Sequence, residues 1–141
     1  MAMTEREDDR VLEPFFAAAR RLAERENPRA RAKGLRRTAQ LWHFIGEHEQ
    51  AAKSYSQLIP IMETLVREKS RTQADLGSDH YGRACALALL GRTGDAMVDL
   101  RKAVEYRGVD VNTLKKDREI DSLRELPGFA EILRLAPSRR R

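Results

Sequence analysis

The chain has 141 residues, of which 41% are hydrophobic and 35% are charged, so it can bury one modest core. Its eight glycines and five prolines are too few for the many turns of an all-β fold, and one cysteine excludes an internal disulfide. With an all-β fold excluded, we expect an all-α protein. The formal net charge is +5. No apolar run approaches the roughly 18 residues of a membrane-spanning helix, so we expect the protein to be cytoplasmic and to have no membrane partner.

The first predicted helix follows residues 1–10, a charged lead without an apolar period that we expect to be disordered. From residue 11 to residue 23, apolar side chains recur at steps of three and four. Pro14 fits the first turn of this helix, and Pro28 marks its end. Three large side chains stand on the apolar face: Phe15, Phe16 and Leu22. This face favours either self-association into a homodimer or docking on the next hairpin.

The second and third predicted helices are separated by Gly46, which can adopt the left-handed backbone that closes a helix. The second begins at about residue 28, and the third begins near His48. The apolar stripe of the third continues past Pro60, so we expect a bent but continuous helix there. Between residues 68 and 77 the pattern fades, which leaves either an overhanging helical end or a loop.

The fourth and fifth predicted helices fold back on each other around Gly91. The fourth begins near Ser78 or Asp79, either of which can cap it. A turn-rich tail with short helices follows, starting at Asp110. We expect residues 137–141 to form a basic, mobile end.

The two glycine-centred hairpins carry similar side chains at the same offsets. The matched residues are Ala39 and Ala84, Gly46 and Gly91, Ala51 and Ala96, Tyr55 and Leu100, and Leu58 and Ala103. This pattern resembles the tetratricopeptide repeat (TPR), in which small residues allow close helix packing and an aromatic side chain fills the gap to a neighbour. The two glycines lie farther apart than the 34 residues of that repeat, so the first copy is divergent.

The tail resembles the segment that follows the terminal tetratricopeptide unit of many bacterial helical-repeat proteins. The residues that carry this likeness are Asp117, Leu123, Arg124, Pro127 and Phe129. Together the resemblances imply one TPR-like domain of five main helices plus short C-terminal helices over residues 11–136. They place repeat one at about 28–66, repeat two at about 78–106 and a C-terminal cap at about 109–135.

In that family, the first helix of each repeat lines a concave face that binds ligands. By offset from the glycines, the resemblance assigns these residues to it: Lys33, Arg36, Gln40, His43, Phe44 and Tyr81. Such a basic and aromatic groove suits an acidic segment with apolar anchors, which implies a protein-binding adaptor or scaffold. The alternative is that the tail or the first helix folds into the groove and makes it part of the core.

No sequence motif predicts catalysis, a cofactor or a metal site. The three histidines, His43, His48 and His80, lack zinc-ligand spacing, and Cys85 lies in an apolar run that favours a buried thiol. Neither a phosphate-binding loop nor a nucleophile elbow occurs. Arginines between residues 20 and 37, and the final SRRR, leave a nucleic-acid-associated or regulatory role as the alternative to an adaptor.

Overall fold

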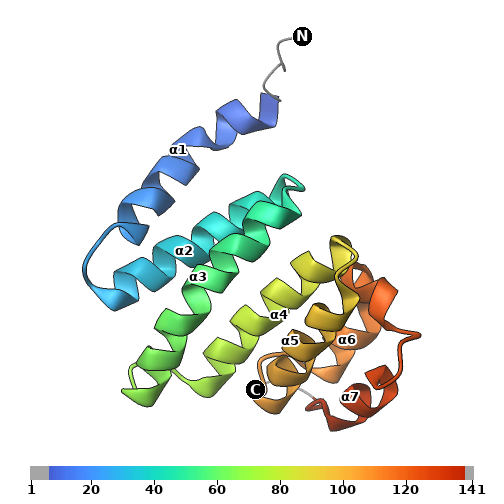
Figure 1. Cartoon of the computed structure of the whole chain (residues 1–141). Coiled ribbons are helices and arrows are strands. Elements are labelled where there is room, and N and C mark those ends of the chain that lie inside the picture. The colour runs from blue at the N-terminus through green and yellow to red at the C-terminus, as the bar shows by residue number, and fades with distance from the viewer. Residues whose placement is uncertain (1–6, 139–141) are drawn as a thin grey trace.

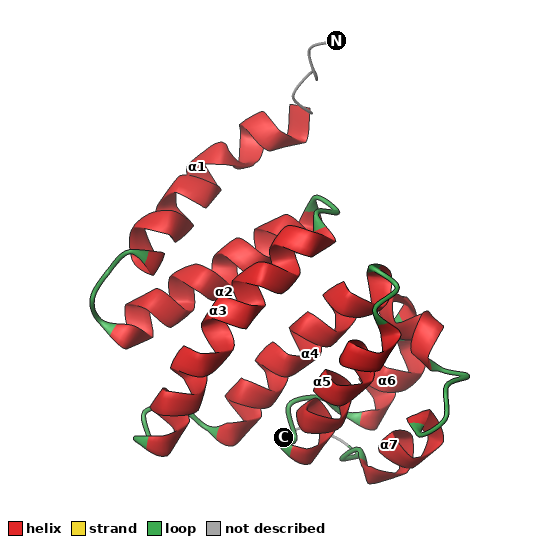
Figure 2. Ribbon diagram, in the orientation of Figure 1, coloured by secondary structure: helices red, strands yellow, loops and turns green. Residues whose placement is uncertain are grey.

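The computed structural model of the chain describes residues 7–138, and within this range it contains helices and turns but no strand (Figures 1 and 2). The five longer helices are α1 (Glu7–Ala23), α2 (Pro28–Phe44), α3 (His48–Arg67), α4 (Gln73–Leu89) and α5 (Thr93–Glu105). The three short segments are α6 (Val111–Lys116), the 3-10 helix η1 (Arg118–Leu123) and α7 (Phe129–Leu135). The expected all-α class is confirmed, and none of these helices is long and apolar enough to cross a membrane.

Two helical hairpins, α2–α3 and α4–α5, form the centre of the molecule (Figure 1). Each turns at a glycine with left-handed backbone, since φ is 83° at Gly46 and 79° at Gly91. After each glycine, a backbone N–H donates to a carbonyl in the last turn of the preceding helix, Glu47 to Trp42 and Arg92 to Leu87, both at 2.9 Å. The turns predicted at the two glycines are therefore confirmed.

Helix α4 begins earlier than the sequence pattern predicted. Thr72 caps it through a capping box, because the Thr72 hydroxyl accepts from the N–H of Asp75 while the Asp75 carboxylate accepts from the N–H of Thr72. The predicted start at Ser78 or Asp79 is wrong: of the segment left open between residues 68 and 77, residues 73–77 belong to the start of α4, and the residues before them form the connection from α3. Gly77 is tolerated inside the helix because its Cα faces Gly108, where an added Cβ would lie 3.0 Å from the Gly108 backbone.

Helix α1 also begins earlier than expected, at Glu7, so the first residues of α1 fall in the predicted disordered lead. Pro14 consequently lies beyond the first turn, where it removes one backbone hydrogen bond of the helix. The rest of the predicted lead, residues 1–6, and the end of the basic tail, residues 139–141, lie outside the described residues.

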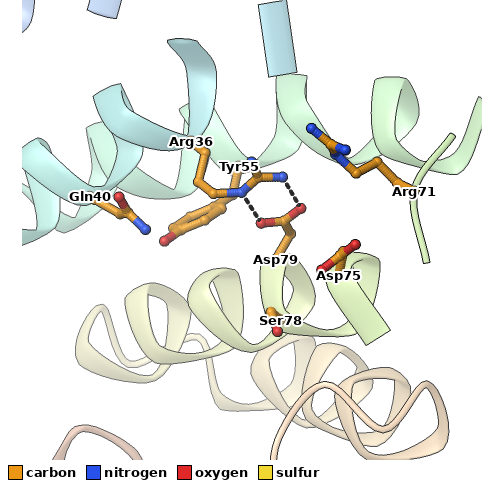
Figure 3. Close-up of a pocket in the computed structure, with 7 residues that line it drawn as sticks. All are labelled: Arg36, Gln40, Tyr55, Arg71, Asp75, Ser78 and Asp79. Carbon is orange, nitrogen blue, oxygen red and sulfur yellow. Dashed lines mark hydrogen bonds and ion pairs between the residues drawn. The ribbon is translucent and has the colours of Figure 1, made fainter. Parts of the chain in front are cut away.

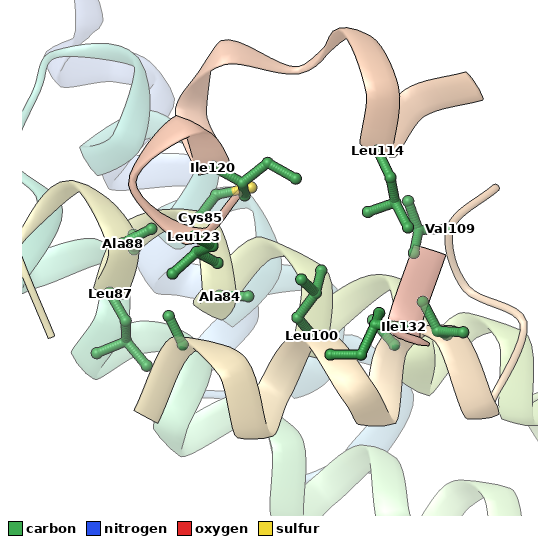
Figure 4. Packing of buried hydrophobic residues seen from close by; sticks show 14 of the residues in the cluster. Ala84, Cys85, Leu87, Ala88, Leu100, Val109, Leu114, Ile120, Leu123 and Ile132 are labelled. Carbon is green, nitrogen blue, oxygen red and sulfur yellow. The ribbon is translucent and has the colours of Figure 1, made fainter. Parts of the chain in front are cut away.

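The hydrophobic core has two parts. One lies between α2 and α3 and includes Leu58 and Met62. The other lies between α4, α5 and the tail, where side chains such as Leu100, Ile120 and Leu123 are fully buried (Figure 4). Neither part contains a residue of α1, which packs on the outer side of α2 (Figure 1).

Arg124 contacts several segments of the tail. Its guanidinium donates to the carbonyls of Leu114 and Asp117, both at 2.6 Å, and to the carboxylate of Asp121 at 2.8 Å. The same group stands 5.7 Å from the centre of the Phe129 ring. One side chain therefore links α6, η1 and α7 to one another.

Candidate functional site

Two hollows in the surface flank helix α2 and share Gln40. The first, which we call the polar hollow, has a volume of about 430 Å³ and lies between α2, α3 and α4 (Figure 3). The second, the apolar hollow, has a volume of about 630 Å³ and lies between α1 and α2. Its apolar lining includes Leu12, Phe15, Ala18, Leu41 and Phe44.

An ion pair between α2 and α4 crosses the polar hollow. Arg36 donates from Nε to Oδ1 of Asp79 at 2.8 Å and from Nη2 to Oδ2 at 2.9 Å. The Asp79 carboxylate is buried, and its hydrogen bond raises the pKa of Arg36 above the ordinary value. A bidentate pair of this kind fixes the orientation of both side chains, so it sets the distance between the two hairpins at this point.

At one end of the hollow, Tyr55 presents its hydroxyl beside the Gln40 amide (Figure 3). The Tyr55 side chain is only 7% exposed, and its ring fills the place beside Gly82, where an added Cβ would lie 2.4 Å from Cζ of Tyr55. Within the described part of the chain, no residue hydrogen-bonds to this hydroxyl. Burial raises the pKa of Tyr55 strongly, so the hydroxyl keeps its proton and remains a donor.

At the other end, Arg71 and Asp75 face the hollow (Figure 3). Burial alone would raise the pKa of Asp75, but the hydrogen bonds with Thr72 outweigh it and hold that pKa below its ordinary value. Asp75 is therefore charged at neutral pH. The Arg71 guanidinium donates a long hydrogen bond from Nη1 to the carbonyl of Ser70, at 3.4 Å, and its positive charge also lowers the pKa of Asp75.

The residues predicted for a concave groove divide into two groups in the structure. Three are exposed along α2: Lys33, Gln40 and Phe44. The other three are engaged within the protein: Arg36, His43 and Tyr81. The structure therefore brings the exposed three together on one helix edge and separates them from Tyr81.

The tail occupies the positions next to His43 and Tyr81. His43 Nε2 contacts the carboxylate of Glu119, and the Tyr81 hydroxyl donates to the carboxylate of Asp117. Both acidic residues belong to the turn at the start of η1. This part of the groove is thus filled by the protein itself, which was the alternative left open by the sequence.

The first helix docks on the first hairpin. Phe16 is 6% exposed, and the centre of its ring lies 4.6 Å from that of Trp42. Phe15 is 60% exposed at the rim of the apolar hollow, and Leu22 is half-buried. Of the three residues predicted for self-association, Phe15 alone presents a largely free side chain.

Cys85 lies near two carboxylates of the tail. Its sulfur and one oxygen each of Asp117 and Glu119 lie within 4.8 Å of one another, a spacing that a metal ion could bridge. Both carboxylates have partners, because Asp117 accepts from Tyr81 and Glu119 contacts His43. Burial raises the pKa of Cys85, so the group forms a hydrogen-bonded anchor for the tail with a neutral thiol.

Sequence reasoning missed the charged residues that the fold buries, Asp79 and Asp99. Asp99 accepts hydrogen bonds from His80, at 2.9 Å, and from Nε of Arg83, at 2.7 Å, and thereby links α5 to α4. One signal was present in the sequence, since Asp99 lies between Ala96 and Ala103 on the apolar face of its helix. A charge at such a position predicts a buried partner but does not identify it.

The arrangement around α2 offers hydrogen-bond donors and charges on one side of a helix and an apolar hollow on the other. Such a surface can bind a segment that carries both kinds of group. Comparisons with protein-family models, curated proteins and solved structures found no match to this chain.

Proposed function

We propose that the protein is a non-catalytic adaptor that binds an acidic partner segment with apolar anchors across helix α2. The main support for this proposal is that the apolar hollow and the polar hollow lie on either side of one exposed edge of α2 and share Gln40. Phe44, 77% exposed, and Phe15 border the apolar hollow and provide a contact for an apolar anchor. A partner segment would cover both side chains.

Charge favours an acidic partner. Arg37 lines the apolar hollow, and Lys33 and Arg29 are exposed on the same helix. Carboxylates of a partner segment would meet these cations at the rim, where complementary charge increases the association rate and the specificity. The net charge of +5 also attracts an acidic partner at longer range.

The stacked hairpins support a TPR-like architecture as part of this proposal. Each hairpin is an antiparallel helix pair closed by a glycine with positive φ, and the tail packs on the second pair. Arrays of this kind expose helix faces along a continuous surface, which suits the binding of extended or helical segments.

Selection of random peptides displayed on phage, with the full-length protein as bait, tests the proposal. We expect enriched peptides to combine Asp or Glu with Leu or Phe. Fluorescence polarisation with the synthetic peptides should show affinity at least about tenfold weaker for Phe44→Glu and Arg37→Glu, because each change places a negative charge on the docking surface.

Val98→Glu is the matched control, since Val98 is 58% exposed on α5, away from both hollows, and its replacement should leave affinity unchanged. The proposal fails if no peptide is enriched, or if Phe44→Glu binds the peptides as well as the wild type does. It also fails if light scattering shows a dimer that Phe44→Glu dissociates, because a second copy of the chain would then occupy the apolar hollow.

A further inference from the structure

The apolar hollow is a short groove between two neighbouring helices. Its lining runs from Leu12 to Ala19 on α1 and from Arg37 to Phe44 on α2, and the two helices lie side by side (Figure 1). Each run spans two helical turns, about 10 Å at about 1.5 Å of rise per residue. Two turns of a further helix would therefore match the groove in length.

The groove provides little for the backbone of an extended segment. Its walls are helices whose own N–H and C=O groups form helical hydrogen bonds, and of its eight described lining residues only Arg37 and Gln40 have polar side chains. An extended segment would bring backbone donors and acceptors into this contact without partners, which is costly. A helix satisfies those groups internally and presents side chains alone, so the lining favours a helical partner.

The groove has room for two apolar side chains of such a helix. Phe15 and Phe44 line it from opposite helices, and both are exposed. Residues four apart on a helix lie on one face and are separated by about 6 Å along its axis. Two apolar residues at this spacing fit within the groove and would cover both phenylalanines.

Beyond the groove, α2 continues as a row of exposed cations. Arg37, Lys33 and Arg29 follow one another at steps of four, and no described residue forms an ion pair with any of their side chains. The sequence of α2 contains no aspartate or glutamate. Arg29 lies in the first turn, where a positive charge opposes the helix dipole. These charges are therefore available to the carboxylates of a partner.

A partner helix that lies along α2 has the same rise per residue, so its acidic side chains can recur at the same steps as these cations. A nucleic acid could contact the row but would leave the apolar groove uncovered. A second copy of this chain is a poorer occupant, because it also has a net charge of +5.

We propose that the partner segment is an acidic amphipathic helix that lies along α2. Two apolar residues four apart fill the apolar hollow, and acidic residues at the following steps of four face Arg37, Lys33 and Arg29. This inference rests on the proposed binding of an acidic segment at α2, and it adds the conformation of that segment and the spacing of its side chains.

Two designed peptides on an alanine and glutamine background test the inference with the full chain. Each has two leucines four apart and three glutamates at the next steps of four, which precede the leucines in one peptide and follow them in the other, so both directions along α2 are covered. We expect at least one to bind in fluorescence polarisation and to show helical ¹³C shifts when bound. A central proline should raise its dissociation constant at least about tenfold, because proline breaks the helix.

Lys33→Glu tests the row of cations outside the hollow. It should weaken binding at least about fivefold, and a peptide whose middle glutamate is lysine should bind this variant more tightly than the wild type, because the charge pair is restored. Lys53→Glu is the matched control: it changes the net charge equally at an exposed position of α3 that lines neither hollow, and it should leave both affinities nearly unchanged.

The inference is overturned if the proline peptide binds as tightly as its parent, or if Lys33→Glu has no larger effect than Lys53→Glu. Displacement of the bound peptide by a single-stranded oligonucleotide, at a lower concentration than by unlabelled peptide, would also overturn it, since a nucleic acid would then be the better ligand.

The outcomes separate this inference from the adaptor function. If the phage-selected peptides bind at α2 with the ¹³C shifts of an extended chain, the helical partner is wrong and the adaptor function stands. If neither the designed nor the selected peptides bind, both proposals fail.

Discussion

At the scale of single residues, Asp99 shows how the fold keeps a charge inside the protein. Both carboxylate oxygens accept hydrogen bonds, Oδ1 from His80 and Arg83 and Oδ2 from Arg83. Burial alone would raise the pKa of Asp99, but the hydrogen bonds from His80 and Arg83 outweigh it and hold the pKa below the ordinary 3.8. The charged form of Asp99 therefore stabilises the contact between α4 and α5.

Asp99→Asn should lower the free energy of unfolding by about 1–3 kcal/mol at pH 7, because it weakens a buried, fully paired carboxylate. Since the pKa of Asp99 is lower in the folded state than in the unfolded state, its contribution is complete above pH 3.8 and is lost as pH falls through the folded value. Urea unfolding between pH 7 and acid should show the gap between wild type and variant narrowing below about pH 4.

Asp95→Asn on the same helix is the control, because Asp95 is exposed and its loss should cost less than about 1 kcal/mol. A gap between wild type and Asp99→Asn that is independent of pH would show that the charge of Asp99 is not what stabilises the folded state.

At the scale of elements, Gly34 sets the distance between α1 and α2. A Cβ at this position would lie 2.3 Å from the backbone nitrogen of Ala23 and 2.6 Å from the carbonyl oxygen of Ala19. Both atoms belong to the backbone of α1, so no side-chain rotation relieves the overlap. The backbones of the two helices can approach this closely because Gly34 has no Cβ.

Gly34→Ala should therefore displace α1 and lower the free energy of unfolding by about 1–3 kcal/mol, despite the better helix propensity of alanine. Trp42 reports the displacement, because it packs against Phe16 of α1 and its fluorescence should shift to the red. Gly94→Ala is the control: nothing lies within 4 Å of its added Cβ, so the change should be neutral or stabilise by up to about 1 kcal/mol. Equal stability of the two variants with unchanged Trp42 emission would contradict this prediction.

The elements themselves were largely predictable from the sequence, and the exceptions have local causes. The turns at Gly46 and Gly91 were predicted because a glycine after an apolar stripe is a short-range signal. The start of α4 was missed, although Thr72 and Asp75 have the spacing of a capping box, because the apolar pattern fades between residues 68 and 77, a segment that includes Gly77. The glycine is accommodated by its contact with Gly108, which periodicity does not reveal.

The candidate site was predictable only in part, because its geometry depends on partners far away in the chain. Offsets within a repeat place Arg36 and Tyr81 on first helices, but not the residues that face them. Arg36 pairs with Asp79 of the other hairpin, and Tyr81 pairs with Asp117 of the tail. Such pairings arise from the stacking of elements, so the sequence predicted positions along α2 and missed the hollow that depends on Tyr55.

At the scale of the whole molecule, the attachment of α1 differs from that of the other long helices. Helices α2 and α5 each contribute buried residues to one part of the core and α3 and α4 to both, whereas the buried residues of α1, Phe16 and Ala19, belong to neither part. Among the described residues, α1 packs chiefly on α2, where Phe16 contacts Trp42 and the α1 backbone approaches Gly34. In proteins built from stacked helices, stability is approximately a sum of neighbouring interfaces, so a terminal helix with one interface is the first to separate.

We therefore predict that α1 opens before the two hairpins unfold. Hydrogen exchange under native conditions should be faster for the amides of α1 than for those of α4, which is packed between α3 and α5. In urea, the emission of Trp42 should change at a lower concentration than the helical signal of circular dichroism. Phe16→Ala should move the Trp42 transition to a still lower urea concentration and leave the midpoint of the circular-dichroism transition unchanged.

Leu123→Ala provides the opposite perturbation, because Leu123 is fully buried between the tail and the second hairpin. It should lower the free energy of unfolding measured from the circular-dichroism transition by about 2–5 kcal/mol and leave the midpoint of the Trp42 transition nearly unchanged. Coincident transitions in the wild type, with α1 amides protected as strongly as those of α4, would show that α1 unfolds together with the core. Because α1 forms one wall of the apolar hollow, its opening would also remove that hollow, so a bound partner segment should slow exchange in α1.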